Sequence, residues 1–591
     1  MFPDDSPLMA ALGPYGPAEQ MQSNAVTFRF MPAGEIIEVG EPSLPTATSV
    51  TWSAEEMQFV RSAFDYIATF VNLTFTEVAA GNASASISLY EVPDLGESAG
   101  FVTYIEVGQA IAVIGSEYTG EITFDQDNTT VIHEIGHALG LAHPHDGPAT
   151  LPGVTGQNDK GDLNLNTEFV TRMSYVPGES PLHPGVDIWG EGATLGALDI
   201  AVLQQLYGAN TSTGLGDTTY GDTRRLETIW DNGGSDLIDF SNATENAVID
   251  LRPATLMLDE GGGGYLSFIE SQNGTVADGG YTIAYGVVIE NASGGAGADR
   301  ITGNDVDNLL LGNGGNDLID GGAGMDTAIY SGARDSYTLT LSQAGTTVLD
   351  RRADGDGLDT LANVEAVFFD DAGGVFDLAV FGGTAGLDEA AMRSFIELYI
   401  AYFNRAPDAI GLNFWGTAFA NGTSLSQMAT YFIDQDETRA TYSEGLSNAD
   451  FATAVYANVL GRVADQDGYD FWVGVLDEGS VGRDQFILSV LDGAKAAPQP
   501  GASQEFIAQQ AADRAYLSTK TDIGAYYAVT KGMSDVGNAV SAMELFTGSA
   551  SSITAAQNAI DNYYISALDA DNGAFLMPLV GVLDDPFAGV A

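Results

Sequence analysis

The sequence predicts a multidomain protein with a mixed α/β (α+β) domain, a parallel β-roll and an all-α C-terminal domain. At 591 residues the chain is too long for one hydrophobic core. Its middle part is rich in Gly, Asp and Asn with short β-type segments, and helical periodicity returns only after about residue 385. The expected segments are an N-terminal arm or propeptide, a first domain, a β-roll with its β-cap, helical repeats and a helical tail: 1–45, 46–210, 211–377, 385–500 and 501–591.

Acidic residues dominate the charge, with 81 Asp and Glu against 20 Lys and Arg and a formal net charge of −61. We therefore expect no nucleic-acid partner, because no basic surface exists to neutralise phosphates. Two interpretations of the acidity stay open: solubility, including adaptation to high salt, and the binding of divalent cations by oxygen ligands. Cysteine is absent, and no run is long enough to span a membrane.

The first domain shows both kinds of periodicity. Ser53 and Glu56 form a capping-box signature, which predicts a helix from about Trp52 with one apolar face. Alternating runs at 87–90 and 101–104 predict strands. Further helices are expected from about Thr129, and from Leu198 to Tyr207 with Gly208 as the C-cap.

Residues 131–143 contain the spacing H-E-x-x-H-x-x-G-x-x-H. His133 and His137 are four residues apart, so on a helix they project from one face and can share a metal ion. Gly140 can take the positive φ that ends the helix and turns the chain, which lets His143 supply a third nitrogen. Glu134 follows the first ligand, where its carboxylate can take a proton from water.

Three imidazoles leave one coordination position for water, which is the arrangement of a catalytic zinc ion. The alternative is that these are ordinary core histidines. The chain has only five histidines, and three of them occupy the motif, which favours one bound zinc ion.

A second element, Thr171-Arg-Met-Ser-Tyr175, lies downstream. Together with the histidine motif it resembles the metzincins, in the form found in serralysin-like peptidases of family M10, and residues 206–210 resemble the end of that catalytic domain. The resemblance implies that Met173 forms an apolar floor under the metal. It also implies that Tyr175 is an additional, displaceable zinc ligand that stabilises the oxyanion. His145 and His183 fit no ligand position and are expected at the surface.

Residues 294–302 match the nonapeptide G-G-x-G-x-D-x-U-x, and further steps begin at 303, 312 and 321. Aliphatic residues or Ala at the eighth position argue against the alternative, a flexible linker. Two steps make one turn of a roll, so Asp299 should stack over Asp317 and Asn308 over Asp326. The sixth positions, which are expected to bind calcium, are Asp299, Asn308, Asp317 and Asp326.

These repeats resemble the RTX calcium-binding domain attached to serralysins, and 228–236 and 285–292 resemble the segments that open it. The resemblance implies several structural calcium ions. One would be bound by side chains and carbonyls of Asp231, Asp236, Gly214, Gly216, Thr218 and Gly233. A second would be bound by Gly234, Asp236, Val288 and Glu290.

A helical unit is duplicated near the C-terminus, because Tyr399, Arg405, Asp408, Gly411 and Trp415 recur as Tyr456, Arg462, Asp465, Gly468 and Trp472. The unit resembles a helical domain known as DUF4214. Two roles stay open for it: a structural one, in which the repeated residues cap a helix and bury Trp415, and adhesion to a surface polymer.

The predicted function is a secreted zinc endopeptidase that cleaves extracellular proteins and peptides, with Glu134 as general base. Residues 1–5 do not resemble a Sec signal, and the last basic residue is Lys531. With the RTX resemblance, this implies export by Gram-negative type I secretion machinery. The alternative is a calcium-dependent surface or adhesion protein with an inactive peptidase domain.

Overall fold

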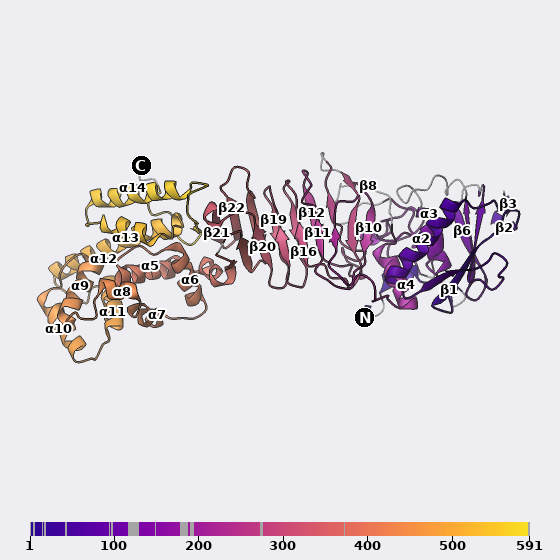
Figure 1. Cartoon of the computed structure of the whole chain (residues 1–591). Helices are drawn as coiled ribbons and strands as arrows, with labels where there is room; N and C mark the ends of the chain where they lie inside the picture. The colour runs from indigo at the N-terminus through magenta and orange to yellow at the C-terminus, as the bar shows by residue number, and fades with distance from the viewer. Residues whose placement is uncertain are drawn as a thin grey trace. The chain divides into compact units, whose positions relative to one another are not determined.

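The computed structural model describes the chain except for residues 1, 4–5, 15, 17–18, 42–43, 94, 96–98, 116–128, 148, 178–186, 190–193, 272–275, 372 and 589–591. Two compact units are present, Met1–Asn313 with Asp320–Asp326, and Gly314–Ile319 with Thr327–Ala591. Figure 1 labels the elements, and we treat each unit by itself.

A five-stranded sheet forms the first part of unit 1, in the order β4-β1-β5-β7-β6. Four of its strands are parallel: β4 (Thr74–Glu77), β1 (Ala25–Phe30), β5 (Ile87–Val92) and β7 (Gln109–Gly115). The edge strand β6 (Gly100–Glu106) is antiparallel to β7. The predicted strands at 87–90 and 101–104 are therefore confirmed as parts of β5 and β6.

The N-terminal residues form part of this fold, so the expectation of an arm over 1–45 is wrong for residues 25–30. β1 lies between β4 and β5, with Val26 and Phe28 buried. Helix α1 (Pro7–Leu12) is buried as well, and the Leu12 carbonyl accepts a hydrogen bond of 3.0 Å from Ala142 N. The alternation in β1 is too short to stand out beside its Pro- and Gly-rich flanks, which is why it escapes sequence reading.

Three longer helices complete this part of unit 1. Helix α2 (Ala54–Phe70) starts with the predicted capping box, in which Ser53 N donates to Glu56 Oε2 at 2.6 Å and Glu56 N donates to Ser53 Oγ at 3.1 Å. Helix α3 (Thr129–Ala138) contacts β6 and β7. Helix α4 (Ala197–Tyr207) ends at Gly208, whose φ is +86°. The remaining short elements are β2 (Ile36–Glu41), β3 (Leu44–Thr48), η3 (Asp162–Asn164) and β8 (Asp187–Trp189).

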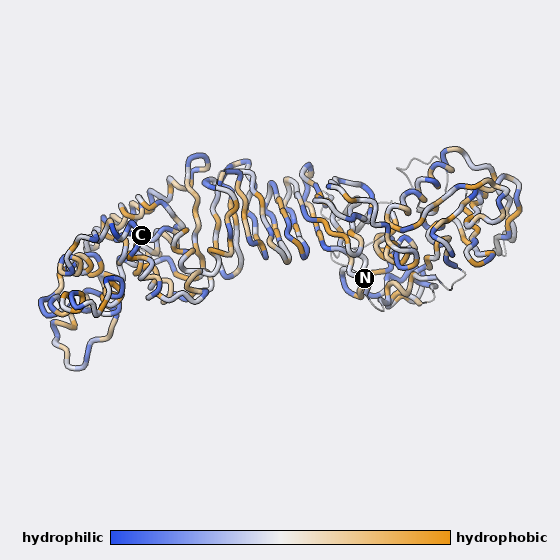
Figure 2. Tube along the Cα trace, turned by 60° about the horizontal axis from the view of Figure 1, so that its bottom comes forward, coloured by the Kyte–Doolittle hydropathy of each residue, from blue (hydrophilic) through white to orange (hydrophobic). Residues whose placement is uncertain are grey.

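The rest of unit 1 consists of short strands, mostly parallel. The neighbours β9-β11-β16-β18 are parallel, as is the pair β12-β17. Figure 2 shows hydrophobic stretches alternating with hydrophilic turns along this strand-rich part. The strands are β9 (Thr219–Tyr220), β10 (Leu226–Ile229), β11 (Leu237–Asp239), β12 (Ala247–Asp250), β13 (Phe268–Ile269), β14 (Val276–Asp278), β15 (Gly280–Ile283), β16 (Asn291–Ser293), β17 (Arg300–Thr302) and β18 (Leu309–Leu311).

Unit 2 begins with strands as well. β20 pairs with β24 in parallel, whereas β21, β22 and β23 form an antiparallel meander, and β19 neighbours β23. The strands are β19 (Leu318–Asp320), β20 (Thr327–Tyr330), β21 (Tyr337–Ser342), β22 (Gly345–Asp350), β23 (Leu358–Ala362), β24 (Ala366–Phe369), β25 (Val375–Asp377) and β26 (Leu579–Val580). Short helical turns are η4 (Arg334–Ser336), η5 (Leu378–Val380), η6 (Gly382–Gly386) and the π-helix η7 (Tyr526–Thr530).

The helices of unit 2 follow the predicted all-α pattern. Asp408 and Asp465 cap the duplicated helices α6 and α10 by accepting from the N–H groups of Gly411 (2.7 Å) and Gly468 (2.9 Å). None of the helices within the described residues has the length and apolar character needed to cross a membrane. They are α5 (Glu389–Phe403), α6 (Ala409–Ala420), α7 (Leu425–Ile433), α8 (Asp436–Thr441), α9 (Asn448–Leu460), α10 (Gln466–Asp477), α11 (Arg483–Lys495), α12 (Gln504–Ala525), α13 (Val536–Glu544) and α14 (Ala550–Ala567).

Candidate active site

The three histidines of the motif converge on one point. The Nε2 atoms of His133, His137 and His143 lie 3.0 to 3.2 Å from one another. Helix α3 presents the first two, and Gly140, with φ of +104°, turns the chain back so that His143 reaches them. These residues form a group that can hold a metal ion.

Each imidazole also binds an oxygen through its other nitrogen. His133 Nδ1 lies 2.9 Å from the Arg172 carbonyl, His137 Nδ1 lies 2.7 Å from the Leu141 carbonyl, and His143 Nδ1 lies 3.1 Å from an Asp146 carboxylate oxygen. An oxygen acceptor at Nδ1 places the proton there and leaves a lone pair on Nε2. Three lone pairs facing one point repel one another unless a cation lies between them, so the ligand set fits zinc.

Burial keeps these imidazoles neutral. It lowers the pKa of His137 to about 4, and desolvation is also the first cause of the lowered pKa values of His133 and His143. Neutral imidazole is the form that binds metal. At neutral pH the site therefore needs to release no histidine proton before it takes up an ion.

Glu134 lies beside the ligands on α3 and is 4% exposed. Burial raises the pKa of its carboxyl group to about 8. Its Oε2 has no hydrogen-bond partner among the described residues. Gly100 on β6 makes room for this carboxylate, because a Cβ there would come within 2.6 Å of Glu134 Oε1. A carboxyl group with so high a pKa holds and returns a proton readily, and a cation bound beside it would favour the carboxylate form that takes one.

Tyr175 and Met173 come from the loop between α3 and α4. The Tyr175 hydroxyl lies 2.6 Å from His143 Nε2. Met173 is fully buried, and a Cβ added at Gly136 of α3 would lie 3.2 Å from its sulfur. The structure thus brings both residues to the histidine cluster, Tyr175 beside the ligands and Met173 beneath the helix that carries two of them.

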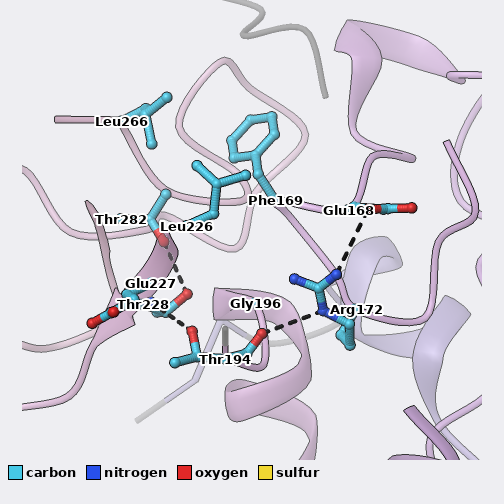
Figure 3. Close-up of a pocket in the computed structure, with 10 residues that line it drawn as sticks. All are labelled: Glu168, Phe169, Arg172, Thr194, Gly196, Leu226, Glu227, Thr228, Leu266 and Thr282. Atoms are coloured by element: carbon cyan, nitrogen blue, oxygen red, sulfur yellow. Dashed lines mark hydrogen bonds and ion pairs between the residues drawn. The ribbon is translucent and has the colours of Figure 1, made fainter. Parts of the chain in front are cut away.

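Asp199 of α4 anchors the segment that carries Met173. Its carboxylate accepts hydrogen bonds from the Thr171 hydroxyl (2.6 Å), Arg172 N (2.6 Å) and Gly196 N (2.9 Å). Arg172 is 3% exposed, and its guanidinium contacts Glu168 and the Thr194 carbonyl beside a cavity of about 10 Å³ that has room for one water molecule (Figure 3). Because the Arg172 carbonyl accepts from His133, Asp199 orients a metal ligand through this residue.

Replacing Asp199 by Ala is expected to destabilise unit 1 by about 2–4 kcal/mol, because two buried N–H groups lose their acceptor. Zinc affinity should fall about tenfold or more, since the Arg172 carbonyl is no longer held in place. Denaturant unfolding and competitive zinc titration measure the two effects. Asp65→Ala, an exposed position on α2, is the matched control. Unchanged stability and zinc affinity in Asp199→Ala would show that this carboxylate has no anchoring role.

An open cleft of about 360 Å³ adjoins the histidine cluster. Its lining combines the edge strand β6 with residues of α3 and the following turn: among them Gly100, Phe101, Val102, Tyr104, Glu134 and His143. The Tyr104 hydroxyl lies 2.6 Å from the His137 carbonyl and 2.8 Å from the Glu19 carbonyl, so the N-terminal segment also lines the cleft. An extended peptide can add to such an edge strand by pairing with its backbone.

One expectation about the histidines is wrong. His145 is not a surface residue: its side chain is 13% exposed and stacks on His143 with ring centroids 5.1 Å apart. The sequence signal that could have predicted this contact is the position of His145, two residues after the ligand His143. His183 lies outside the described residues. Sequence reasoning also missed Gly100, Asp146 and Asp199, of which only Asp146, three residues after a ligand, leaves a local trace.

The residues expected to bind calcium at the start of the strand-rich part lie close together. Asp236 is fully buried, Asp231 is 4% exposed, and Asp236 N donates to Glu290 Oε2 at 2.9 Å. Asp231 Oδ1 accepts from Gly233 N (3.0 Å), and the Gly214 carbonyl accepts from Asn232 N (2.7 Å). Gly234 packs directly over Gly216, whereas the side chain of Val288 is 40% exposed. Burial and then neighbouring carboxylates raise the pKa of Asp236, whose Oδ2 has no partner within the described part of the chain.

Further along, the structure stacks Asn308 and Asp326 as expected, with Asn308 N donating to Asp326 Oδ1 at 2.8 Å. Asp299 accepts from Ala247 N at 2.6 Å. Asp299, Asn308, Asp317 and Asp326 are all at most 2% exposed. Carboxylates buried to this degree need partners of opposite charge.

Three family models match the chain. One described as Matrixin matches residues 43–174, and one described as Peptidase M10 serralysin C terminal matches residues 198–372. A domain of unknown function, DUF4214, matches residues 429–498. Two of these models describe M10 peptidases, and they match the part that holds the histidine cluster and the strand-rich part that follows it.

Curated relatives show a more specific similarity. Metallopeptidase AprA of Pseudomonas marginalis is 35% identical over 265 residues, which is 40% of this chain and 49% of that protein. Serralysin of Proteus mirabilis is 31% identical over 327 residues (46% and 62%), and Serralysin C of Dickeya chrysanthemi is 34% identical over 312 residues (47% and 58%). Over this part the chain is similar to the serralysin-like M10 metallopeptidases. It spans about half to three fifths of the length of these relatives.

Proposed function

We propose that the chain is a zinc-dependent endopeptidase that hydrolyses peptide bonds of extracellular proteins. The observation that carries the proposal is the convergence of three Nε2 atoms within 3.2 Å of one another, each on a ring whose Nδ1 already binds an oxygen. His133, His137 and His143 would hold the metal, and Tyr175 lies close enough to join them.

Zinc bound there would polarise the scissile carbonyl and lower the pKa of the attacking water. The residues of the chain supply the proton transfers. A carboxylate oxygen of Glu134 takes a proton from the attacking water and passes it to the leaving amine. The Tyr175 hydroxyl, which is polar and partly exposed, donates a hydrogen bond to the oxyanion. Edge strand β6, which lines the cleft together with Glu19, aligns the substrate backbone.

Zinc removal and return is the direct test. Dialysis against a zinc chelator is expected to abolish cleavage of an unstructured protein such as casein, and added zinc should restore it. Catalysis and metal content should recover together, with one zinc ion per chain by elemental analysis. Cleavage that persists in zinc-free protein would refute the peptidase assignment. A folded chain that binds zinc but never cleaves would favour an inactive, adhesive protein.

We propose further that the strand-rich part over 211–377 is an RTX-type β-roll that binds several structural calcium ions. Buried carboxylates at Asp236, Asp299 and Asp326 support this, because hard cations select oxygen ligands. Such a domain would fold where calcium is abundant, which fits an extracellular location and export by type I secretion machinery. The serralysin-like relatives and the net charge of −61 support the same proposal.

The segments 1–45 and 385–591 lead to further proposals. Any processing within 1–45 should end before Ala25, because β1 is a central strand.

For the helical repeats over 385–500 we propose a structural role first. Arg405 is bound by Glu437 at 2.9 Å and Arg462 by Asp513 at 2.7 Å, so each repeated arginine joins helices. Contact with a surface polymer is the second role, and residues 501–591 would include the export signal.

A further inference from the structure

The helical repeats of unit 2 contain a cleft of their own, with a volume of about 460 Å³. Four helices contribute to its lining: the C-terminal parts of α5 and α7, the middle of α6 and the start of α8 (Figure 1). Aromatic side chains form one part of this lining, namely Tyr399, Phe403, Trp415 and Phe432. Polar and charged side chains form the other part, so the cleft can hold a ligand that has both an apolar face and polar groups.

Trp415 is the centre of the aromatic part. Its ring packs against Phe432 edge-on, with centroids 5.2 Å apart and an interplanar angle of 76°. Tyr431 stacks on it at 28°, with centroids 5.9 Å apart. Tyr431 is 53% exposed, and Phe414, which contacts Trp415 on α6, is 44% exposed. Aromatic surface gathered at one place and left open to water is typical of a binding site.

Arg405 disfavours a cationic ligand in this cleft. Its guanidinium carbon lies 5.5 Å from the centroid of the Tyr399 ring and 5.4 Å from that of the Phe403 ring. Both contacts are of the cation–π kind, so two of the aromatic rings that could attract a cation already hold one from the chain. A second positive charge in the same cleft would also be repelled by the guanidinium.

An acidic ligand is disfavoured as well, because the guanidinium is already paired with carboxylates. Arg405 Nε and Nη2 donate to the two carboxylate oxygens of Glu437 at 2.9 and 3.2 Å, and Nη1 donates to Asp408 at 3.2 Å. Asp434 adds another carboxylate to the lining. Arg439 contacts Asp434 at 3.7 Å but is not among the described lining residues. The cleft therefore offers acidic ligands more repulsion than attraction.

The polar part of the lining suits hydroxyl groups. The side chains of Asp434 and Asp436 are exposed and can accept hydrogen bonds from hydroxyls. Gln435 is exposed too, and its Nε2 donates to the Tyr431 carbonyl at 3.1 Å, which orients the amide at the edge of the aromatic part. A sugar ring combines the two required features. One face carries C–H groups that stack on an aromatic ring, and the edge carries hydroxyls that bond to carboxylates and amides.

We propose that this cleft binds a neutral glycan, with a sugar ring stacked on Trp415 and its hydroxyls bonded to Asp434 and Gln435. The inference rests on the second role proposed for the helical repeats, contact with a surface polymer, and gives that polymer a chemical class. The other copy of the duplicated unit differs at this place. Leu460 stands where the first copy has Phe403, and Trp472 packs on Phe486 with ring centroids 5.1 Å apart.

Glycan binding by the full chain tests the site. On a printed array of neutral, uronic-acid and amino-sugar oligosaccharides, the chain should bind neutral ones, and calorimetric titration with the strongest of these gives a Kd. Trp415→Leu should raise this Kd about tenfold or more, because the stacking surface is lost. Gln435→Ala should raise it about two- to tenfold through one lost hydrogen bond. Trp472→Leu makes the same change in the second copy and should leave the Kd unchanged.

The outcomes separate this inference from the peptidase proposal. A chain that cleaves casein but binds no glycan on the array, or binds only uronic acids, overturns the inference alone. So does tighter binding of a trimethyl-lysine peptide than of any neutral glycan, or an equal loss in Trp415→Leu and Trp472→Leu. Should circular dichroism show that Trp415→Leu does not fold, Gln435→Ala and Asp434→Ala decide. Both positions are exposed, and an unchanged Kd in both variants would exclude the site.

Discussion

Replacing Glu134 by Gln is expected to abolish nearly all proteolysis and to leave zinc binding intact. The amide fits the space left by Gly100 but cannot accept a proton from water, so kcat should fall about 10²- to 10⁴-fold. The three imidazoles are untouched, and one zinc ion per chain should remain by elemental analysis. Steady-state cleavage of a fluorogenic peptide measures the loss.

Glu106→Gln is the matched control for this prediction. Glu106 is an exposed residue at the far end of β6, the strand that carries Gly100, so its substitution should change kcat by less than about twofold. A Glu134→Gln enzyme that turns over at near wild-type rate would exclude Glu134 as the general base. Loss of zinc from that variant would instead give the carboxylate a structural role.

Removal of calcium is expected to unfold the strand-rich part of the chain. Asp236, Asp299 and Asp326 are buried carboxylates, whose burial costs free energy unless a cation lies beside them. Each site filled at 100 times its Kd contributes about 2.7 kcal/mol. The thermal transition should therefore move down by many degrees in EGTA, as followed by circular dichroism. New proteolytic cuts should appear between residues 213 and 362.

Two controls make the calcium result specific. Magnesium at the same concentration should not restore the transition, because it demands smaller, octahedral sites. Asp299→Asn should reproduce part of the EGTA effect, whereas Asp305→Asn, exposed in the neighbouring step, should not. Identical melting with and without EGTA would exclude structural calcium.

Sequence predicted what is encoded locally. The histidine spacing, the positive φ at Gly140 and the capping box at Ser53 each depend on residues within one or two turns of chain. The nonapeptide steps are local too, since each supplies its own glycine and its own Asp or Asn at the sixth position. For such features the spacing of residues in the sequence largely determines the local geometry.

Features built from distant segments escaped prediction. β1 pairs with strands some fifty residues later, and its six residues contain no pattern that predicts which strands these are. Asp199 is linked to the metal site by hydrogen bonds from Thr171 and Arg172. The sequence around it predicts only the start of a helix.

The place of β1 has a consequence for how the first unit reaches its native state. In its five-stranded sheet only β6 and β7 are joined as neighbours by a short turn, while every other pairing bridges a long stretch of chain. Closing such loops is entropically slow, so nucleation should begin at the β6–β7 hairpin, and β1 should dock late, together with its edge neighbour β4. Strand β6, along which we propose that substrate binds, would then form before the rest of the sheet, and the residues nearest the start of the chain would join it late.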